Sequence, residues 1–206
     1  MDRRLAPSSK QVRGELTRQK LIDAAVALIR AQGYAATSVE QLCAHAGVTK
    51  GAFFHHFTGK DDLAAAAARY WGRRADELFA VPGHDDPVAV LLAYCDARTA
   101  LMEGTLAGCT CLAGTMVQEV HSTSEPLREA CAEAIFGHAA MLEAACARAL
   151  ARHGVGDMTA ASLALHIQAV VQGAFIVAKA AGDMAPARDT MAHLRRYLLA
   201  LFKPGE

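Results

Sequence analysis

The sequence lacks long apolar segments and any pattern of regularly alternating apolar and polar residues. No apolar run reaches the roughly 18 residues of a membrane-spanning helix, and the first fifteen residues carry charges where a signal peptide is apolar. Strands half-buried in a sheet would show the missing alternation. We therefore expect a helical, cytoplasmic protein that does not associate with membranes.

The sequence also lacks the cysteine spacing of disulfide frameworks and zinc sites. Its six cysteines lie within apolar helical patterns, so we expect reduced thiols and a reducing compartment. Cys109 and Cys111 are two residues apart, which on one helix turns their side chains about 200° away from each other. Since no second Cys/His pair has zinc spacing, we predict no metal site. A single reactive thiol remains an alternative.

Motifs of catalysis are missing as well. The sequence has no phosphate-binding loop, no nucleophile elbow and no carboxylate–histidine cluster with catalytic spacing. We predict that the protein is not an enzyme, with no catalytic residues and no cofactor. Turnover by the body of the protein alone would revive the enzyme hypothesis.

Net charge is zero, but the charge is unevenly distributed. The first 60 residues carry nine Lys/Arg against four Asp/Glu, a net of +5, which the remainder of the chain balances. A basic N-terminal quarter favours a polyanion-binding module joined to a second part. A solvated basic tail is the alternative reading of the same charges.

Helical periodicity is present throughout, and the 53% hydrophobic content is ample for a core. Thr37 and Glu40 have capping-box spacing, and Gly33 is placed to end the first helix. Thr49 is placed to cap the third helix, and Thr58 with Asp61 the fourth. The predicted helices span residues 17–32, 38–45, 49–57, 58–79, 87–103, 108–121, 125–153, 159–181 and 186–203, an all-α fold preceded by a disordered or flexible arm over residues 1–14.

Residues 47–60, "GVTKGAFFHHFTGK", follow a short helix and begin another. Two short helices joined by a tight turn with glycine in the middle are typical of the helix-turn-helix, whose second helix lies in the DNA major groove. Gly47 fits a left-handed turn conformation. Phe53 and Phe57 are four residues apart and are predicted to face inward, which leaves Lys50 and Phe54 outward.

The segment "TRQKLIDAAVALIRAQGYAATSVEQLCAHAGVTKGAFFHHFTGKDDL" resembles the N-terminal domain of the TetR/AcrR family of bacterial transcriptional regulators. The resemblance covers about residues 14–63 and rests on Gly33-Tyr34, Thr37, Ala46-Gly47-Val48, Gly51, Phe57 and Lys60. It implies an all-helical homodimer with a three-helix DNA-binding head, assigned here to residues 15–62, and a ligand-binding, dimerising body, assigned to residues 63–206.

The resemblance also implies a set of DNA contacts with double-stranded operator DNA. Phosphates would be held by Thr37, Ser38 and Lys60, and the major groove would be entered by Thr49, Lys50 and Gly51. Lys50 would donate to guanine. Phe54 replaces the family's usual tyrosine, so a thymine-methyl contact would stand in for a hydroxyl contact. His55 and His56 would touch phosphate or base, or else one of them packs on the first helix, whereas Tyr34 is expected to pack.

The body would hold a small-molecule inducer, whose identity the sequence does not give. Residues 110–130, "TCLAGTMVQEVHSTSEPLREA", resemble a segment found in part of the family. Polar and soft side chains on apolar helices are the pocket candidates, with two phenylalanines as walls; they are Met102, Cys111, Met116, Gln118, Glu119, Phe136, His138, Met141, His166, Gln168, Gln172 and Phe175. Core packing of the methionines and phenylalanines, and interface roles for the two histidines, are the alternatives.

Small residues on the predicted helices 125–153 and 159–181 permit close helix packing, and the family pairs its last two long helices with those of a second copy. We expect a homodimer through these helices, with a monomer that folds them inward as the alternative. The sequence thus predicts a ligand-responsive repressor that binds a palindromic operator and is released by an inducer. A thiol sensor of electrophiles or oxidants on the same DNA-binding head and an architectural module without a ligand are the competing hypotheses.

Overall fold

The computed structural model describes residues 9–80 and 84–203, and within these ranges every regular element is an α-helix. The predicted all-α fold is confirmed. The helices are α1 (Ser9–Gln32), α2 (Val39–Ala46), α3 (Lys50–His56), α4 (Lys60–Leu78), α5 (Pro87–Leu101), α6 (Leu106–Cys109), α7 (Leu112–Val120), α8 (Glu125–His153), α9 (Ala160–Ala181) and α10 (Ala185–Leu201).

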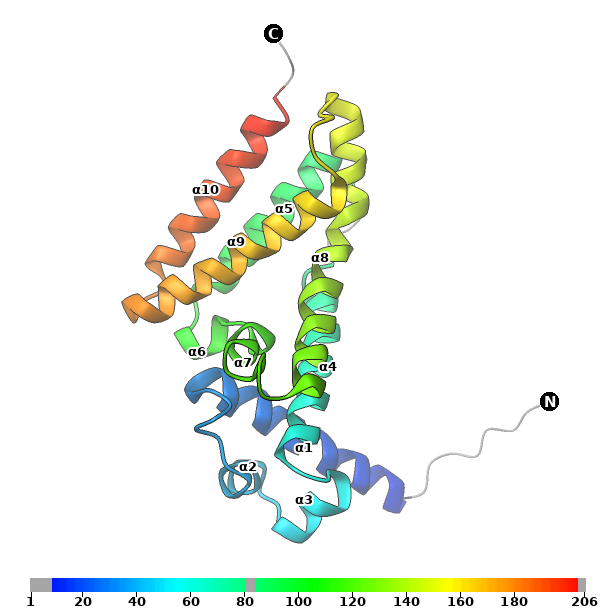
Figure 1. The fold of residues 1–206 in the computed structure, drawn as a ribbon, viewed down its shortest axis with the longest axis vertical. Coiled ribbons are helices and arrows are strands. Elements are labelled where there is room, and N and C mark those ends of the chain that lie inside the picture. Colours follow the sequence, from blue (N-terminus) through cyan, green and yellow to red (C-terminus); the bar gives the residue numbers. More distant parts are fainter. Residues whose placement is uncertain (1–8, 81–83, 204–206) are drawn as a thin grey trace, which may run out of the picture.

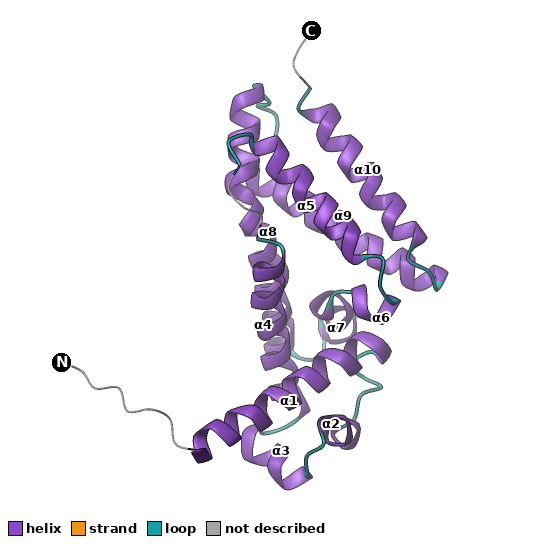
Figure 2. Cartoon of the chain, turned by 180° about the vertical axis from the view of Figure 1, so that it is seen from behind, coloured by secondary structure: helices purple, strands orange, loops and turns teal. Residues whose placement is uncertain are grey.

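The molecule is elongated, with α1, α2 and α3 at one end and the body helices at the other (Figure 1). Helix α4 runs from the head into the body, where it packs along α8, and α8 packs in turn on α9. Helices α6 and α7 lie between α1 and the upper body helices, an arrangement visible from both sides (Figures 1 and 2). The two ends are therefore joined by helices and not by a loose linker.

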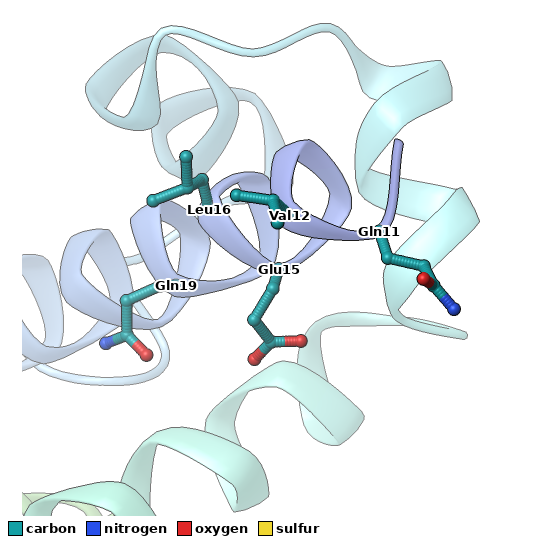
Figure 3. Close-up of a pocket in the computed structure, with 5 residues that line it drawn as sticks. All are labelled: Gln11, Val12, Glu15, Leu16 and Gln19. Atoms are coloured by element: carbon teal, nitrogen blue, oxygen red, sulfur yellow. The ribbon is translucent and has the colours of Figure 1, made fainter. Parts of the chain in front are cut away.

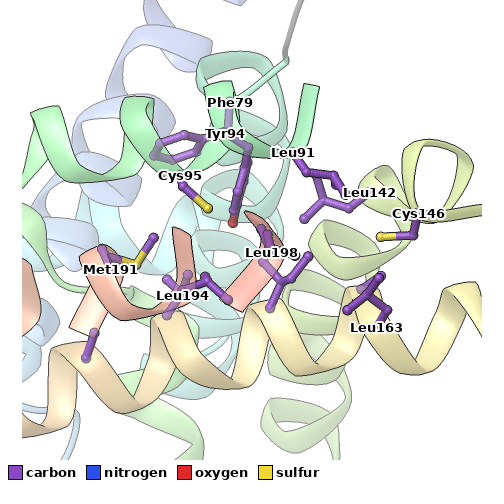
Figure 4. Packing of buried hydrophobic residues seen from close by; sticks show 14 of the residues in the cluster. Phe79, Leu91, Tyr94, Cys95, Leu142, Cys146, Leu163, Met191, Leu194 and Leu198 are labelled. Carbon is purple, nitrogen blue, oxygen red and sulfur yellow. The ribbon is translucent and has the colours of Figure 1, made fainter. Parts of the chain in front are cut away.

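Two buried clusters form the core. One lies among α5, the second half of α8, α9 and α10, where Tyr94, Leu142 and Leu198 meet (Figure 4). The other fills the head with Leu21, Phe53 and similar side chains, and continues into α7 and the start of α8. The boundary between residues 62 and 63 was placed where the sequence resemblance ends, but the buried core continues across it.

Local signals explain the short helices of the head. Gly47 ends α2 with φ +66°, the left-handed conformation that glycine adopts without a Cβ clash. Thr49 caps α3, as predicted, because its hydroxyl accepts a hydrogen bond from the Ala52 N–H at 3.2 Å.

The capping box of α2 is one residue later than the sequence suggested. Ser38 is the N-cap, and its box partner is Gln41 and not Glu40. Thr37 is buried instead, and its hydroxyl donates to the Gly33 carbonyl at 2.7 Å. Thr37 and Glu40 do not form a capping box because the buried Thr37 hydroxyl already donates to the backbone at the end of α1.

Three further boundaries differ from the predictions. Helix α1 begins at Ser9, so residues 9–14 are helical and not part of an arm. No residue after Pro7 breaks a helix, because a glycine such as Gly14 destabilises a helix by only about 1 kcal/mol. Residues 1–8 lie outside the described residues. Helix α4 has no side-chain cap, and Asp62, not Asp61, accepts hydrogen bonds from Thr58. The single helix predicted over 108–121 is two helices, α6 and α7.

Helices α8 and α9 are long and apolar enough to cross a membrane by length and composition alone, a test that core helices of soluble proteins also pass. Alanine, glycine and valine raise their apolar content without lengthening any uninterrupted apolar run. Only 44% and 39% of their most apolar windows are buried within the chain. Both helices therefore present apolar surface that the protomer itself does not cover.

Candidate functional site

Helix α3 exposes a mixed basic and aromatic face. Phe54 is 58% exposed, whereas Phe53 and Phe57 are buried in the head core, as their spacing predicted. Lys50 is exposed at the start of the helix and forms an ion pair with Glu40 of α2. Hydrogen bonding to Lys50 lowers the pKa of Glu40 to about 2, so the carboxylate is ionised and competes with any other acceptor for the ammonium.

The two histidines of α3 differ in their surroundings. Their rings contact each other edge to face, with centroids 5.0 Å apart. His55 is exposed, whereas His56 is half-buried beside Gly14 of α1. The packing alternative thus describes His56, and His55 is the one that faces solvent.

The expected phosphate-binding residues lie at the start of α2 and of α4. The Ser38 hydroxyl accepts a hydrogen bond from the Gln41 N–H. The Thr37 hydroxyl is buried in the head, so only the backbone of Thr37 faces outward. Lys60 lies over the Tyr34 ring at 4.0 Å and donates to the Tyr34 carbonyl at 3.1 Å. Because an ammonium has three donors, two remain for a phosphate. Tyr34 itself is half-buried and donates its hydroxyl to Asp61.

Glu119 joins the body to the head. Its carboxylate on α7 accepts hydrogen bonds from the backbone N–H groups of Tyr34 at 2.9 Å and Ala35 at 2.7 Å, in the turn after α1. A Cβ at Gly33, where φ is +91°, would lie 2.6 Å from this carboxylate. Glu119 was predicted to contact a ligand, but in the structure its carboxylate is hydrogen-bonded to the head.

Arg30 makes a second connection between the head and the body. Its guanidinium stacks over Trp71 of α4 at 4.2 Å, and its Nε donates to the Thr110 carbonyl at 2.7 Å. Nη2 donates to the Gly108 carbonyl. Burial lowers the pKa of Arg30. These bonds hold the break between α6 and α7 against α1.

Two adjacent cavities lie inside the body between α4, α5, α6, α8 and α9. The larger has a volume of about 100 Å³ and the smaller about 20 Å³. Five of the twelve ligand candidates line them, namely Met102, Cys111, His138, Gln168 and Phe175. Sequence reasoning missed Arg98, Trp71 and Thr110, which line the same space.

Arg98 is buried at 9% exposure and lies over the Phe79 ring at 3.7 Å. Its Nε donates to the Tyr94 hydroxyl at 3.0 Å, and Nη2 lies 2.8 Å from Nε2 of His138. Nδ1 of His138 lies 2.9 Å from the Asp76 carboxylate. Burial, and secondarily the charge of Arg98, lower the pKa of His138, so the ring is neutral, donates from Nδ1 and accepts at Nε2.

The other ligand candidates lie elsewhere. Gln118 and Gln172 line a third hollow of about 20 Å³ together with Cys111 and Lys179. Met116 is fully buried in the head cluster, and Met141 is half-buried on α8. Phe136 and His166 are exposed, with the His166 ring against Tyr197. Only part of the predicted set therefore shares one space.

A hollow of about 620 Å³ lies on α1 (Figure 3). All five side chains that line it, Gln11, Val12, Glu15, Leu16 and Gln19, belong to that one helix. It is therefore an open surface groove and not an enclosed site.

An exposed recognition helix on a helix-turn-helix head, joined through a shared core to a helical body with an internal cavity, defines a DNA-binding transcriptional regulator. Residues 21–67 match the model of the bacterial regulatory proteins of the tetR family. Residues 87–193 match the C-terminal domain of LmrA/YxaF-like transcriptional regulators. The chain belongs to the TetR family.

Similar proteins extend over most of the chain. The HTH-type regulator YxaF of Bacillus subtilis is 28% identical over 173 residues, which cover 82% of this chain and 88% of that protein. A TetR regulator from Chloroflexus aurantiacus of known structure is 28% identical with a TM-score of 0.79, covering 91% and 96% of the two chains. The reduced form of Escherichia coli NemR is 24% identical with a TM-score of 0.74, covering 87% and 95%.

Proposed function

We propose that the protein is a cytoplasmic repressor that binds a palindromic operator as a homodimer and releases it when a small molecule enters the body. The observation that carries this proposal is Arg30. The Arg30 side chain of the head lines the body cavity and also ties α1 to α6, so a ligand that draws Arg30 away from these bonds acts on the position of the head.

The uncovered surface of α8 and α9 supports the dimer. Phe136 is 57% exposed, and Leu165, Ile176 and Val177 are 43 to 50% exposed. A soluble chain rarely leaves so many large apolar side chains on two neighbouring helices in water. A second copy that packs the same helices together buries them, and a two-fold dimer matches a palindromic DNA site.

DNA recognition is proposed to use Lys50 and Phe54 for bases, with Thr49, Gly51 and His55 beside them. Ser38, Lys60 and the backbone at Thr37 would bind phosphates, and His56 would support the helix from behind. Lys50 must leave Glu40 to reach a guanine, which gives the head a built-in competitor for DNA.

The test is a fluorescence-anisotropy titration of the purified protein with duplex DNA from upstream of its own gene, with a scrambled duplex as the control at the same salt. We expect a preference of about a thousandfold and binding in steps of two protomers. Lys50→Ala should reduce this preference, whereas Lys60→Ala should weaken both duplexes alike and make the salt dependence shallower. Equal binding of both duplexes by the wild type at every salt concentration contradicts the proposal.

A thiol sensor remains the second candidate because two body cysteines differ from the rest. Burial raises the pKa of Cys95, Cys131 and Cys146 to about 12, which makes them inert. Cys109 and Cys111 are only half-buried, at the break between α6 and α7, where Arg30 donates to the Gly108 and Thr110 carbonyls.

The solved structure of the Escherichia coli neighbour NemR is a reduced form, and the thiol hypothesis is compatible with it. Loss of operator binding after treatment with an electrophile, prevented by Cys111→Ser but not by Cys95→Ser, would favour this function. Unchanged operator binding by the alkylated wild type would exclude it.

A further inference from the structure

Two cations line the larger body cavity without an anionic partner. Arg98 and Arg30 both face it, and neither forms an ion pair with a carboxylate in the described part of the chain. A buried charge without a counter-charge is costly, and buried guanidinium groups are normally paired. The cavity therefore has a positive potential that the protein does not neutralise.

The neighbours of Arg98 do not supply the missing charge. Both of its hydrogen-bond partners, the Tyr94 hydroxyl and Nε2 of His138, are neutral, and the Asp76 carboxylate is bonded to the other ring nitrogen of His138. Nη1 has no acceptor among residues 9–80 and 84–203. A planar guanidinium with free donors matches the geometry of a carboxylate.

Two polar atoms in the smaller cavity are also unpaired. Oε1 of Gln168 and Oγ1 of Thr110 are buried and have no hydrogen-bond partner among the described residues. Gln168 is 3% exposed and Thr110 is fully buried, and both line the cavity that Arg98 shares. An unpaired buried carbonyl oxygen lacks a donor, which a hydroxyl or amine of a bound molecule supplies.

The walls of the larger cavity are aromatic and apolar. Trp71, Phe79, Phe175 and Met102 line it together with the two arginines. Its volume of about 100 Å³ approaches that of an engineered cavity of roughly 150 Å³ that binds benzene. The space therefore limits an occupant to about one aromatic ring or less.

We propose that the body binds an aromatic acid, with the ring between Trp71 and Phe175, the anionic group on Arg98 and a hydroxyl donating to Oε1 of Gln168. The regulatory meaning of this site rests on the proposed function, since it places the inducer against the arginine that holds the head. The negative charge lies in the same cavity that Arg30 lines, so it attracts the Arg30 guanidinium away from the Gly108 and Thr110 carbonyls.

The experiment is calorimetric titration of the full-length protein with benzoate and with benzamide, which has the same shape and no charge. We expect benzoate to bind at least about tenfold more tightly, a difference of ~1.4 kcal/mol. Arg98→Met should abolish the difference, because methionine fills the space without charge. The matched control is Arg195→Met, whose arginine pairs with Asp96 on the outside of the body and should leave the difference intact.

A second variant keeps the proposal testable if Arg98→Met does not fold. We expect 4-hydroxybenzoate to bind severalfold more tightly than benzoate to the wild type, and Gln168→Met to remove only this gain. Equal affinities for benzoate and benzamide, an Arg98→Met variant that keeps the preference, or no binding of benzoate at about 10 mM would each overturn the site.

Operator binding is measured in parallel so that the two proposals fail separately. Specific operator binding without charge-dependent benzoate binding overturns the anion site and leaves the repressor intact. Charge-dependent benzoate binding by a protein that shows no preference for its own upstream DNA supports the site and contradicts the repressor.

Discussion

Replacing Gln168 by methionine is expected to stabilise the ligand-free protein. The side chain is 3% exposed, and its Oε1 has no hydrogen-bond partner among the described residues. An unsatisfied buried polar group costs about 1–3 kcal/mol, and methionine is similar in volume with no polar demand. Allowing for imperfect repacking, we expect the free energy of unfolding to rise by about 1–2 kcal/mol.

For a chain of 206 residues, each 1 kcal/mol shifts the melting temperature by roughly 2–4 °C, so the variant should melt about 2–8 °C higher. The assay is differential scanning calorimetry without ligand, at one fixed protein concentration, because the proposed dimerisation would make the midpoint depend on concentration. Gln172→Met is the matched control. It lies one turn along α9 and is half-buried, so its change should stay within about 0.5 kcal/mol.

A lower melting temperature for Gln168→Met would refute the reasoning. It would show that the amide is already satisfied, for example by an ordered water, and that the wild-type cavity is not short of a donor. An increase of equal size in Gln172→Met would also refute it, because the gain would then come from apolar surface in general and not from removal of the orphaned oxygen.

Three further outcomes are expected. Glu40→Gln should raise operator affinity roughly twofold to fivefold in an anisotropy titration, because Lys50 is released and a negative charge leaves the DNA face. Burial lowers the pKa of His138 in the folded state, so the unfolded state binds more protons below about pH 6.5 and the free energy of unfolding falls as the pH drops. His138→Gln should therefore flatten the dependence of the melting temperature on pH between about 7 and 5. Glu119→Gln should speed amide hydrogen exchange at Tyr34 roughly tenfold, because one charge-assisted bond becomes neutral, and unchanged exchange would mean that this contact is not maintained in solution.

The head was predictable because its signals are local. The position of Gly47, the cap at Thr49 and the spacing of Phe53 and Phe57 depend on residues within one or two helical turns of each other. Even the error at Thr37 was a shift of one residue between two adjacent hydroxyl side chains. Such signals survive in the folded protein because the short helices are held by their own caps and one apolar face.

The break between α6 and α7 was not predictable from local sequence. Neither Thr110 nor Cys111 is a glycine or proline, and the apolar pattern continues through them. The carbonyls of Gly108 and Thr110, which a continuous helix would use internally, instead accept bonds from Arg30, about eighty residues earlier in the chain. The tertiary contact decides the local structure here.

Arg98 was missed for a related reason. A lone arginine on a helix usually lies on the solvated face. Its burial depends on α4 and α8, which supply Phe79 and His138 from distant parts of the chain. Glu119 shows the opposite error, since a polar residue on an apolar helix suggested a ligand contact and the structure gives it to the turn after α1.

The contacts between head and body determine how much differential binding free energy a ligand must supply to release DNA. Arg30 and Glu119 hold α1 and its following turn to α6 and α7, while Leu112 and Met116 share the head's buried core. A ligand that merely fills the cavity would bind equally well whether the head is placed to bind DNA or not, and it would leave the populations of these two states unchanged. To move the population from mostly bound to mostly released requires about 5.5 kcal/mol of differential affinity, more than one hydrogen bond supplies. An anion that removes Arg30 from both carbonyls acts on two bonds and on the helix break they hold, so charge in the ligand, and not its bulk, is the property to which DNA release should respond.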